Sequence, residues 1–244
     1  MYNKFAYIYD ELMKDVDYKN WYLYIENVFN KFHKTPEDVL EMACGTGNLS
    51  YYLGKKGYDL ICFDISNDML SIAYNKLQNF RNVKIINQNM IDFNINKKFD
   101  AIISICDSIN YILDEKDLLK TFKNVKKHLH KDGIFIFDIN SHYKLSQIIG
   151  NNTFIEDRED IYYIWQNYFD EKSNIAEFYI TFFTMDKDGK YIRFEEEHVE
   201  RAYSTEEITQ LLHSASFKDI YMYNGLSFEE IHDKSERISF IAMT

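Results

Sequence analysis

The sequence predicts an α/β protein with a doubly wound, mostly parallel sheet into which an antiparallel sheet is inserted. Three observations support this fold. Short apolar runs typical of buried strands alternate with helical patterns between residues 39 and 139. This βαβ rhythm indicates parallel strands joined by right-handed crossovers. Beyond residue 150, aromatic and β-branched runs follow one another without helices, which is typical of antiparallel hairpins.

The main sheet and its helices are expected first. Asp17 can cap a helix whose apolar side chains recur at helical spacing. Strands are predicted at Val39–Ala43, Tyr58–Phe63, Val83–Asn87, Phe99–Ile105 and Gly133–Ile139. Helices are predicted from residue 48 to about Lys56, over Asn67–Asn79 and over Asp114–His130.

The last third of the chain is expected to hold two further groups of strands. Three antiparallel strands are predicted at Ile161–Phe169, Ile175–Met185 and Tyr191–Tyr203. A capping box at residues 204–207 opens a helix to about Ser214. Two last strands, Phe217–Tyr223 and Arg237–Met243, are expected to pair and to bring the main sheet to seven strands. We therefore predict one domain of residues 1–150 and 204–244, with the sheet of residues 151–203 inserted.

Composition limits the possible functions. The chain has 244 residues, a net charge of −11 and three cysteines. A chain this acidic repels nucleic acids and anionic membranes unless it carries a local basic patch. No apolar run reaches the roughly 18 residues of a membrane span, and the first residues do not resemble a signal peptide. The cysteines lie in apolar runs, which indicates reduced, buried thiols, so we expect a cytoplasmic protein without a metal site.

The most informative segment runs from Val39 to Ser50. It consists of an apolar strand, a Gly-x-Gly turn at Gly45 and Gly47, and the start of a helix. Glycines permit positive φ and let the backbone approach a ligand with no side chain in the way. In open α/β sheets, ligands bind at the carboxyl ends of the strands, where the strand order reverses. The turn is therefore the predicted ligand site.

An acidic residue completes this pattern. Asp64 ends the second predicted strand, 17 residues after Gly47, and a carboxylate there can accept both hydroxyls of an adenosine ribose. A nicotinamide dinucleotide is the competing ligand, but its fingerprint needs a third glycine where this chain has Ser50. Glu41 would also repel a pyrophosphate, whereas it attracts a ligand that carries a sulfonium and an ammonium group.

These segments resemble those of class I S-adenosylmethionine-dependent methyltransferases, which have a Rossmann-like fold. Residues 41–47 look like their first motif, the Asp64 segment like their ribose-binding motif, residues 88–93 like the segment that flanks adenine, and residues 99–104 like their fourth strand. Residues 2–10 resemble the helix that closes over the cofactor in small-molecule enzymes, such as glycine N-methyltransferase and the deoxysugar N,N-dimethyltransferases. Those enzymes also carry an extra antiparallel sheet near the active site.

The resemblance implies S-adenosyl-L-methionine as the cofactor. It assigns cofactor contacts to Tyr9, Glu41, Ala43, Gly45, Gly47, Asp64, Ile65, Met69, Asn89, Met90 and Cys106. Glu41 would support the turn and the amino group, Asp64 would hold the ribose, and Ile65 would lie against the adenine. Asn89 departs from the family, in which an aspartate is commoner, so its contact with the adenine amino group lacks a charge.

The methyl acceptor is expected at the ends of the fourth and fifth strands, beneath the inserted sheet. The candidate catalytic residues are His142, Asp107 and Tyr9, and His142 is the best-placed general base because imidazole titrates near neutrality. The candidate substrate contacts are Asn110, Tyr111, Arg201 and Tyr203. An ordinary loop hydrogen bond is an equally good explanation for each of these residues.

We therefore expect methyl transfer from S-adenosylmethionine to a nitrogen or oxygen of a small molecule. The protein mainly has to align acceptor, methyl and sulfur, so no catalytic triad is expected. A non-catalytic module that binds the cofactor, a tRNA methyltransferase and an NAD-dependent oxidoreductase stay open as alternatives. The chain lacks the motifs that resemble those of DNA methyltransferases, which argues against DNA as the acceptor. A monomer and a homodimer are both compatible with the sequence.

Overall fold

The computed structural model describes residues 3–244, with side chains from residue 5 onward. The strands of the main sheet are β1 (Asp38–Met42), β2 (Asp59–Asp64), β3 (Val83–Asn87), β4 (Phe99–Ser104), β5 (Leu129–Asn140), β10 (Asp219–Asn224) and β11 (Arg237–Met243). The helices are α1 (Asn3–Leu12), α2 (Tyr18–Lys31), α3 (Asn48–Lys56), α4 (Asn67–Leu77), α5 (Glu115–His128) and α6 (Thr205–Ser214), with a short 3₁₀ turn, η1 (Ser108–Tyr111), and a π-helical segment, η2 (Lys144–Ile149).

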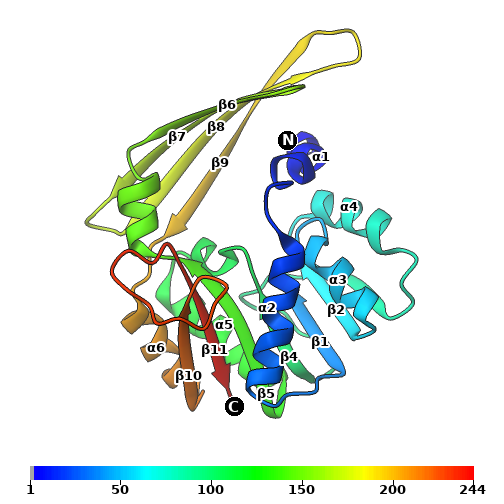
Figure 1. The fold of residues 1–244 in the computed structure, drawn as a ribbon, viewed down its shortest axis with the longest axis vertical. Coiled ribbons are helices and arrows are strands. Elements are labelled where there is room, and N and C mark those ends of the chain that lie inside the picture. Colours follow the sequence, from blue (N-terminus) through cyan, green and yellow to red (C-terminus); the bar gives the residue numbers. More distant parts are fainter. Residues whose placement is uncertain (1–2) are drawn as a thin grey trace.

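The main sheet has the strand order β10-β11-β5-β4-β1-β2-β3 (Figure 1). β11 pairs antiparallel with β10 and with β5, and the other ladders are parallel. The predicted doubly wound, mostly parallel sheet of seven strands is thus confirmed. The order reverses between β1 and β4, and ligands of such sheets bind at the carboxyl ends of the strands beside this switch point.

Helices cover both faces of the main sheet, because successive side chains of a strand point to opposite faces. Ile102 and Phe135 pack in one cluster with apolar side chains of α5 and α6. Their neighbours Ala101 and Ile134 pack in another cluster with side chains of α2 and α3. Strands buried on both faces consist almost entirely of apolar residues, which is why the sequence pattern revealed them.

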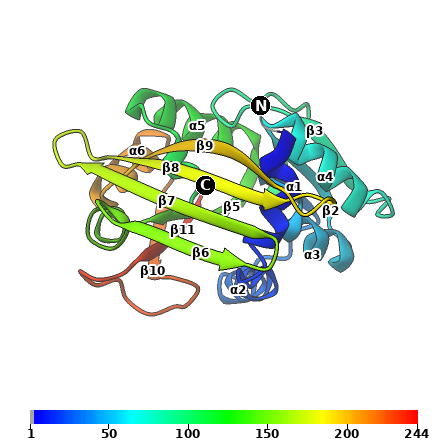
Figure 2. The same ribbon diagram turned by 90° about the horizontal axis from the view of Figure 1, so that it is seen from above.

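A second sheet of four antiparallel strands lies over the carboxyl ends of the main sheet (Figures 1 and 2). Its strands, in spatial order, are β6 (Thr153–Arg158), β7 (Ile161–Asp170), β8 (Ile175–Met185) and β9 (Tyr191–Arg201). The last three lie where strands were predicted. β6 was not predicted, because half of its residues are charged and its pairing with β7, rather than an apolar pattern, holds it in the sheet.

The inner face of the inserted sheet is the face turned toward α1 and the main sheet. β8 and β9 pair without a bulge along their 11 residues each, so alternate residues share this face. Ala176 lies beside Glu200, and Phe178 lies beside His198. Ala176, Phe178 and Glu200 are buried and His198 is half-buried, whereas Glu177 on the other face is exposed.

Most element boundaries lie within two residues of the prediction, and β5 differs most. β5 begins at Leu129 instead of Gly133, because Leu129 pairs with Phe99 of β4 across a register shift. β5 is followed by the π-helical segment η2, which no pattern in the sequence had indicated. The chain turns there into the inserted sheet.

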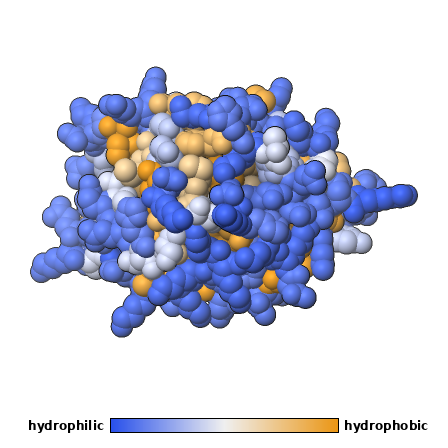
Figure 3. Space-filling model, turned by 90° about the horizontal axis from the view of Figure 1, so that it is seen from below, coloured by the Kyte–Doolittle hydropathy of each residue, from blue (hydrophilic) through white to orange (hydrophobic). Residues whose placement is uncertain are grey.

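The face of the molecule that is seen from below carries mostly hydrophilic residues. Figure 3 shows the molecule from below, where apolar residues gather in one area near the middle of the face and hydrophilic residues surround them. Within residues 3–244, no helix has the length and apolar character that crossing a membrane requires.

Candidate active site

The turn after β1 holds three residues with a left-handed backbone. Ala43 and Gly45 both have φ of 53°, and Gly47, which caps α3, has φ of 78°. A side-chain carbon at Gly47 would come within 3.0 Å of Leu77 and 3.2 Å of Ala73 in α4. The positive φ of residue 47 and the lack of room for a side chain therefore both require glycine at this position. Ala43 adopts the left-handed conformation despite its methyl group, at a cost of roughly 1–2 kcal/mol.

Asp64, at the end of β2, lies directly against this turn. One carboxylate oxygen accepts a hydrogen bond from the Gly45 N–H at 2.9 Å, and the other accepts one from the Ser66 N–H at 2.9 Å. Burial raises the pKa of Asp64, and these backbone hydrogen bonds oppose the shift. A carboxylate offers about four lone-pair sites, so both oxygens can still accept hydrogen bonds from a ligand.

The residues assigned to adenine follow β2 and β3. Ile65 is 67% exposed although it directly follows a buried strand, so it offers an apolar surface to a flat ligand. Met69 is half-buried in the first turn of α4, and Met90 packs against the core of the main sheet. The amide oxygen of Asn89 accepts a hydrogen bond from the N–H of the second residue after it, at 2.9 Å. Contacts of these four residues with adenine remain predictions.

Glu41 ties β1 to α3 beneath the turn. Its side chain is only 2% exposed and accepts a hydrogen bond from the Ser50 hydroxyl. Burial raises the pKa of Glu41 to about 8, and the bond from Ser50 opposes this shift. Glu41 thus joins the two elements on either side of the turn, while a contact with the amino group of the cofactor remains a prediction.

Asp10 fastens α1 across the glycine turn. Its carboxylate accepts hydrogen bonds from the Thr46 hydroxyl at 2.6 Å, the Asn48 amide at 3.0 Å and the Lys76 ammonium at 2.9 Å. These bonds lower the pKa of Asp10 against the opposing effect of burial. Sequence reasoning missed this network because the partners of Asp10 lie 36 to 66 residues away in the chain.

Tyr9 brings α1 close to the turn. Its ring lies 4.0 Å from the point where a side-chain carbon of Gly45 would stand. Burial, and to a lesser extent nearby Tyr18 and Cys106, raises the pKa of Tyr9 well above its usual value, so its hydroxyl stays protonated. Residues 3–10 of the segment that resembles a closing helix lie in α1, and Tyr2 lies outside the described residues.

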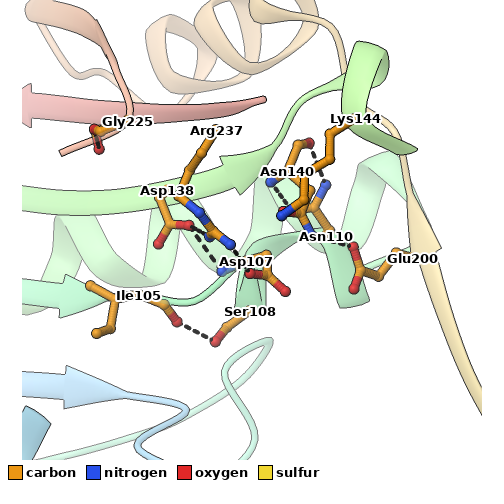
Figure 4. Close-up of polar contacts among 11 residues, drawn as sticks. Ile105, Asp107, Ser108, Asn110, Asp138, Asn140, Lys144, Glu200, Gly225 and Arg237 are labelled. Carbon is orange, nitrogen blue, oxygen red and sulfur yellow. Dashed lines mark hydrogen bonds and ion pairs between the residues drawn. The ribbon is translucent and has the colours of Figure 1, made fainter. Parts of the chain in front are cut away.

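A buried ion network occupies the ends of β4, β5 and β11 (Figure 4). Asp138, at 0% exposure, accepts hydrogen bonds from the Arg237 guanidinium and from the Asp107 N–H at 3.0 Å. Arg237 also pairs with the Asp107 carboxylate at 2.8 Å. Burial raises the pKa of Asp138 to about 6, although Arg237 opposes the shift. Cys106 and Asp107 both have a left-handed backbone, with φ of 57° and 55°, a strain that concentrates at functional sites.

Sequence reasoning overlooked Asp138 and Arg237. Asp138 interrupts an apolar strand, Ile-Phe-Ile-Phe-Asp-Ile, and Arg237 opens another apolar strand. A charged residue in a strand buried on both faces needs a partner of opposite charge. This requirement could have indicated from the sequence that Asp138 and Arg237 form an ion pair.

Four side chains continue the network toward the inserted sheet (Figure 4). Asn110 donates to the carbonyl oxygens of Asn140 and Arg201 and accepts from the Asn140 N–H. Asn140 donates to Glu200 at 3.0 Å and accepts from Lys144 at 2.9 Å. Burial raises the pKa of Glu200 to about 8. Asn110 therefore joins η1, β5 and β9, and its predicted contact with a substrate is untested.

Arg201 and Tyr203 fasten the end of β9. Arg201 donates to the Leu113 carbonyl oxygen and pairs with Glu207 of α6 at 3.0 Å. Tyr203 is 1% exposed, and its hydroxyl donates to the Ile112 carbonyl oxygen. These contacts are internal to the protein, and the substrate contacts predicted for the two residues stay predictions.

Two histidines lie near the predicted acceptor site. His142 is exposed, and its ring nitrogens lie 3.2 Å from the Asn174 amide oxygen and 3.4 Å from the Ser146 hydroxyl. His198, on the inner face of the inserted sheet, lies with Nδ1 3.3 Å from the Tyr111 hydroxyl. His198 was missed because it follows three glutamates, and only the alternation of its strand could have placed it on the inner face.

This arrangement suits an adenosine-containing cation. A carboxylate with free lone pairs lies against a glycine turn, and an exposed isoleucine follows it. Among the side chains that the structure describes, no three of His, Cys, Asp or Glu are grouped as ligands of a metal ion would be. The fold and the site together are those of a doubly wound α/β protein, a class in which ligands bind at the switch point of the sheet.

Known proteins identify the family. Residues 39–133 match the family model described as "Methyltransferase domain". YqeM of Bacillus subtilis, which carries a provisional methyltransferase name, is 34% identical over 247 residues, covering 99% of this chain and 96% of its own. A crystal structure of an S-adenosylmethionine-dependent methyltransferase from Clostridium acetobutylicum has 42% identity and a TM-score of 0.90, covering 99% of this chain and 98% of that one. The chain belongs to the S-adenosylmethionine-dependent methyltransferase family, so the non-catalytic and oxidoreductase alternatives are set aside.

A third relative resembles part of the chain. It is the dTDP-3-amino-3,4,6-trideoxy-alpha-D-glucopyranose N,N-dimethyltransferase of Streptomyces venezuelae, which is 28% identical over 107 residues, or 43% of this chain and 44% of its own. The predicted resemblance to deoxysugar N,N-dimethyltransferases is therefore confirmed.

Proposed function

We propose that this methyltransferase transfers the methyl group of S-adenosylmethionine to a nitrogen or oxygen atom of a small molecule. The observation that carries the proposal is the position of the ion network of Asp107, Asp138 and Arg237. It lies at the ends of β4 and β5, and Glu200 of the inserted sheet is bonded to Asn140 at the same end of β5. An acceptor bound there is enclosed by the inserted sheet, which favours a small molecule over a polymer.

The assignment of cofactor contacts follows the turn and its neighbours. S-adenosylmethionine, when bound, supplies a methyl group on a positively charged sulfur. We assign the ribose hydroxyls to Asp64 and the adenine to a group of apolar and amide side chains, Ile65, Met69, Asn89 and Met90. The methionine portion is assigned to Ala43, Gly45, Gly47 and Glu41, with Tyr9 covering it and Cys106 near the methyl group. The left-handed backbone of the turn and the exposure of Ile65 support these roles.

The acceptor side is assigned to the residues that follow β4 and those that end β9. Asp107 is assigned to the acceptor's polar group, and Asn110, Tyr111, Arg201 and Tyr203 to its surroundings. In this site the chain has three tasks: it holds the acceptor in line with the methyl group, excludes water and accepts a proton. The inserted sheet, residues 151–203, is the substrate-side domain in this proposal.

The names of two relatives support a small amine as the acceptor. One relative is the aminosugar N,N-dimethyltransferase described above, and another is named a glycine/sarcosine N-methyltransferase, from Halorhodospira halochloris, 29% identical over 103 residues. The net charge of −11 disfavours tRNA, because a phosphate polyanion is repelled by an acidic protein.

The test uses the full chain with S-adenosylmethionine labelled in its methyl group. The labelled cofactor is incubated with a low-molecular-weight metabolite extract and, separately, with bulk tRNA. The proposal expects label in small molecules and none in tRNA. An Asp64→Ala variant, assayed with the cofactor well below saturation, serves as the control, because weaker cofactor binding must reduce the label. Label found in tRNA alone would overturn the proposal.

A further inference from the structure

His198 is the one histidine on the inner face of the inserted sheet, and three elements of the protein meet around it. Its Nδ1 lies 3.3 Å from the hydroxyl of Tyr111, which ends η1. Its ring centroid lies 5.5 Å from that of Phe5 in α1 and 5.9 Å from that of Tyr111. β9, α1 and the segment after β4 thus converge on one imidazole.

The same contacts lead from His198 to the glycine turn. Phe5 packs edge-on against Tyr9, with ring centroids 5.7 Å apart. Tyr9 in turn lies next to Gly45, and its hydroxyl is close enough to Cys106 for the thiol to affect its pKa. Two aromatic side chains of α1, Phe5 and Tyr9, therefore connect His198 to the glycine turn.

His198 is half-buried, and its contact Tyr111 is partly exposed at 44%. Burial raises the pKa of Tyr111 well above its usual value, so its hydroxyl stays protonated. Burial also lowers the pKa of His198, so the imidazole is neutral near pH 7. The charged and titratable groups around it are Glu196 and Glu200 on the inner face, Asp107 beyond Tyr111, and the phenols of Tyr9 and Tyr111.

We propose that His198 is the catalytic base that removes the proton of the methyl acceptor, an inference that rests on the proposed transfer to a small molecule. The lone pair of the acceptor atom forms the bond to the methyl carbon, and the carbon–sulfur bond breaks with its electron pair remaining on sulfur. The proton that the acceptor atom carried passes to Nε2 of His198. The imidazolium then releases this proton to solvent, which restores the neutral base.

The role requires one tautomer. Nδ1–H must donate to the Tyr111 oxygen, because only then does Nε2 keep a lone pair. Tyr111 is thus a positioning residue that fixes the ring and its tautomer. His142, the base expected from the sequence, is exposed and bonded to Asn174 and Ser146.

The first test compares three glutamine variants, since glutamine resembles histidine in size and cannot accept the proton. His198→Gln is expected to lower kcat by about 10²–10⁴-fold, with unchanged affinity for S-adenosylhomocysteine in calorimetry. His130→Gln, an exposed histidine at the start of β5, is the matched control and should keep full activity. Glycine, sarcosine and a dTDP-aminosugar are the acceptor probes. Loss of activity in His142→Gln but not in His198→Gln would overturn the proposal.

The second test does not depend on turnover. In the complex with S-adenosylhomocysteine, ¹⁵N NMR of the imidazole should show a proton on Nδ1, a bare Nε2 and a pKa below the usual value near 6.5. Tyr111→Phe should mix the tautomers, lower kcat by roughly tenfold and move the acidic limb of the pH–kcat profile. A proton fixed on Nε2 in the wild type would contradict the assignment. If the wild type methylates none of the probes while the NMR result holds, the proposed acceptor class fails and the tautomer assignment for His198 stands.

Discussion

The cofactor end and the acceptor end of the candidate active site are built in different ways. At the cofactor end, Asp64 bonds to the main chain of Gly45, only 19 residues before it. At the acceptor end, Asp138 bonds to the side chain of Arg237, 99 residues after it. The cofactor end depends on backbone geometry that a short sequence can encode. The acceptor end depends on buried charges that balance one another only after the chain has folded.

Arg237→Ala is expected to have the largest effect, because it leaves Asp138 buried without its cation. Breaking a buried ion pair in this way typically costs about 3–5 kcal/mol, which urea unfolding at pH 7 would measure. Arg193→Ala is the control, since Arg193 pairs with Glu195 on the exposed surface and such pairs contribute about 1 kcal/mol or less. If both variants lost the same free energy of unfolding, the Asp138–Arg237 pair would be no costlier to break than an exposed ion pair, and the acceptor end would not depend on buried charges.

Asp64→Ala tests the cofactor end through binding. We expect a loss of about 10–100-fold in affinity for S-adenosylhomocysteine, because two charge-assisted hydrogen bonds to the ribose disappear. Calorimetry measures the affinity, and circular dichroism checks that the fold is retained. Asp59→Ala removes an exposed carboxylate at the opposite end of β2 and should bind as the wild type does. Unchanged affinity in Asp64→Ala would remove the ribose assignment.

Glu41→Gln tests whether the cofactor end also contains a costly buried charge. The pKa of Glu41 is about 8 in the folded chain, against an ordinary value of 4.5 for a glutamate. The folded chain therefore holds a proton that the unfolded chain has released, and this contribution to stability is present below pH 4.5 and lost as the pH rises toward 8.

The free energy of unfolding of the wild type should thus fall between pH 5 and 8, and Glu41→Gln should lessen this fall by about 1 kcal/mol per pH unit. Urea titrations at several pH values measure the slope. Glu195→Gln, at an exposed site, provides the reference. A slope in Glu41→Gln that equals that of the wild type would show that Glu41 is ionised in the folded protein.

Ala43→Gly should have the smallest effect. Glycine adopts positive φ without the steric cost that alanine has at 53°, but it also increases the entropy of the unfolded chain. We expect a net gain of about 0.5–1 kcal/mol in thermal unfolding, with cofactor affinity unchanged. Destabilisation of this variant would mean that the Ala43 methyl group contributes packing that outweighs the backbone strain.

The same contrast explains what the sequence could predict. The main sheet was predicted because strands such as β4, buried on both faces, are continuous apolar runs. The turn and Asp64 were predicted because their chemistry lies within a short segment. Both depend on local information.

Residues that act through distant partners were harder to predict. Asp10, Asp138 and His198 each lie in a segment whose own pattern accounts for them as ordinary helix, strand or surface residues. The roles of these three residues depend on which segments lie next to each other in the folded protein. The antiparallel strands β7–β9 could be predicted as strands, but the face on which each side chain lies required the register.

That register has a consequence for insertions and deletions. The β8–β9 ladder runs its whole length without a bulge, so removing one residue from the middle of β9 would reverse the orientation of every side chain beyond it. His198 and Glu200 would then point to solvent, while Glu197 and Val199 would enter the interior. The connecting loop at residues 186–190 can change in length without this penalty, so natural length variation in this part of the molecule should be confined to that loop.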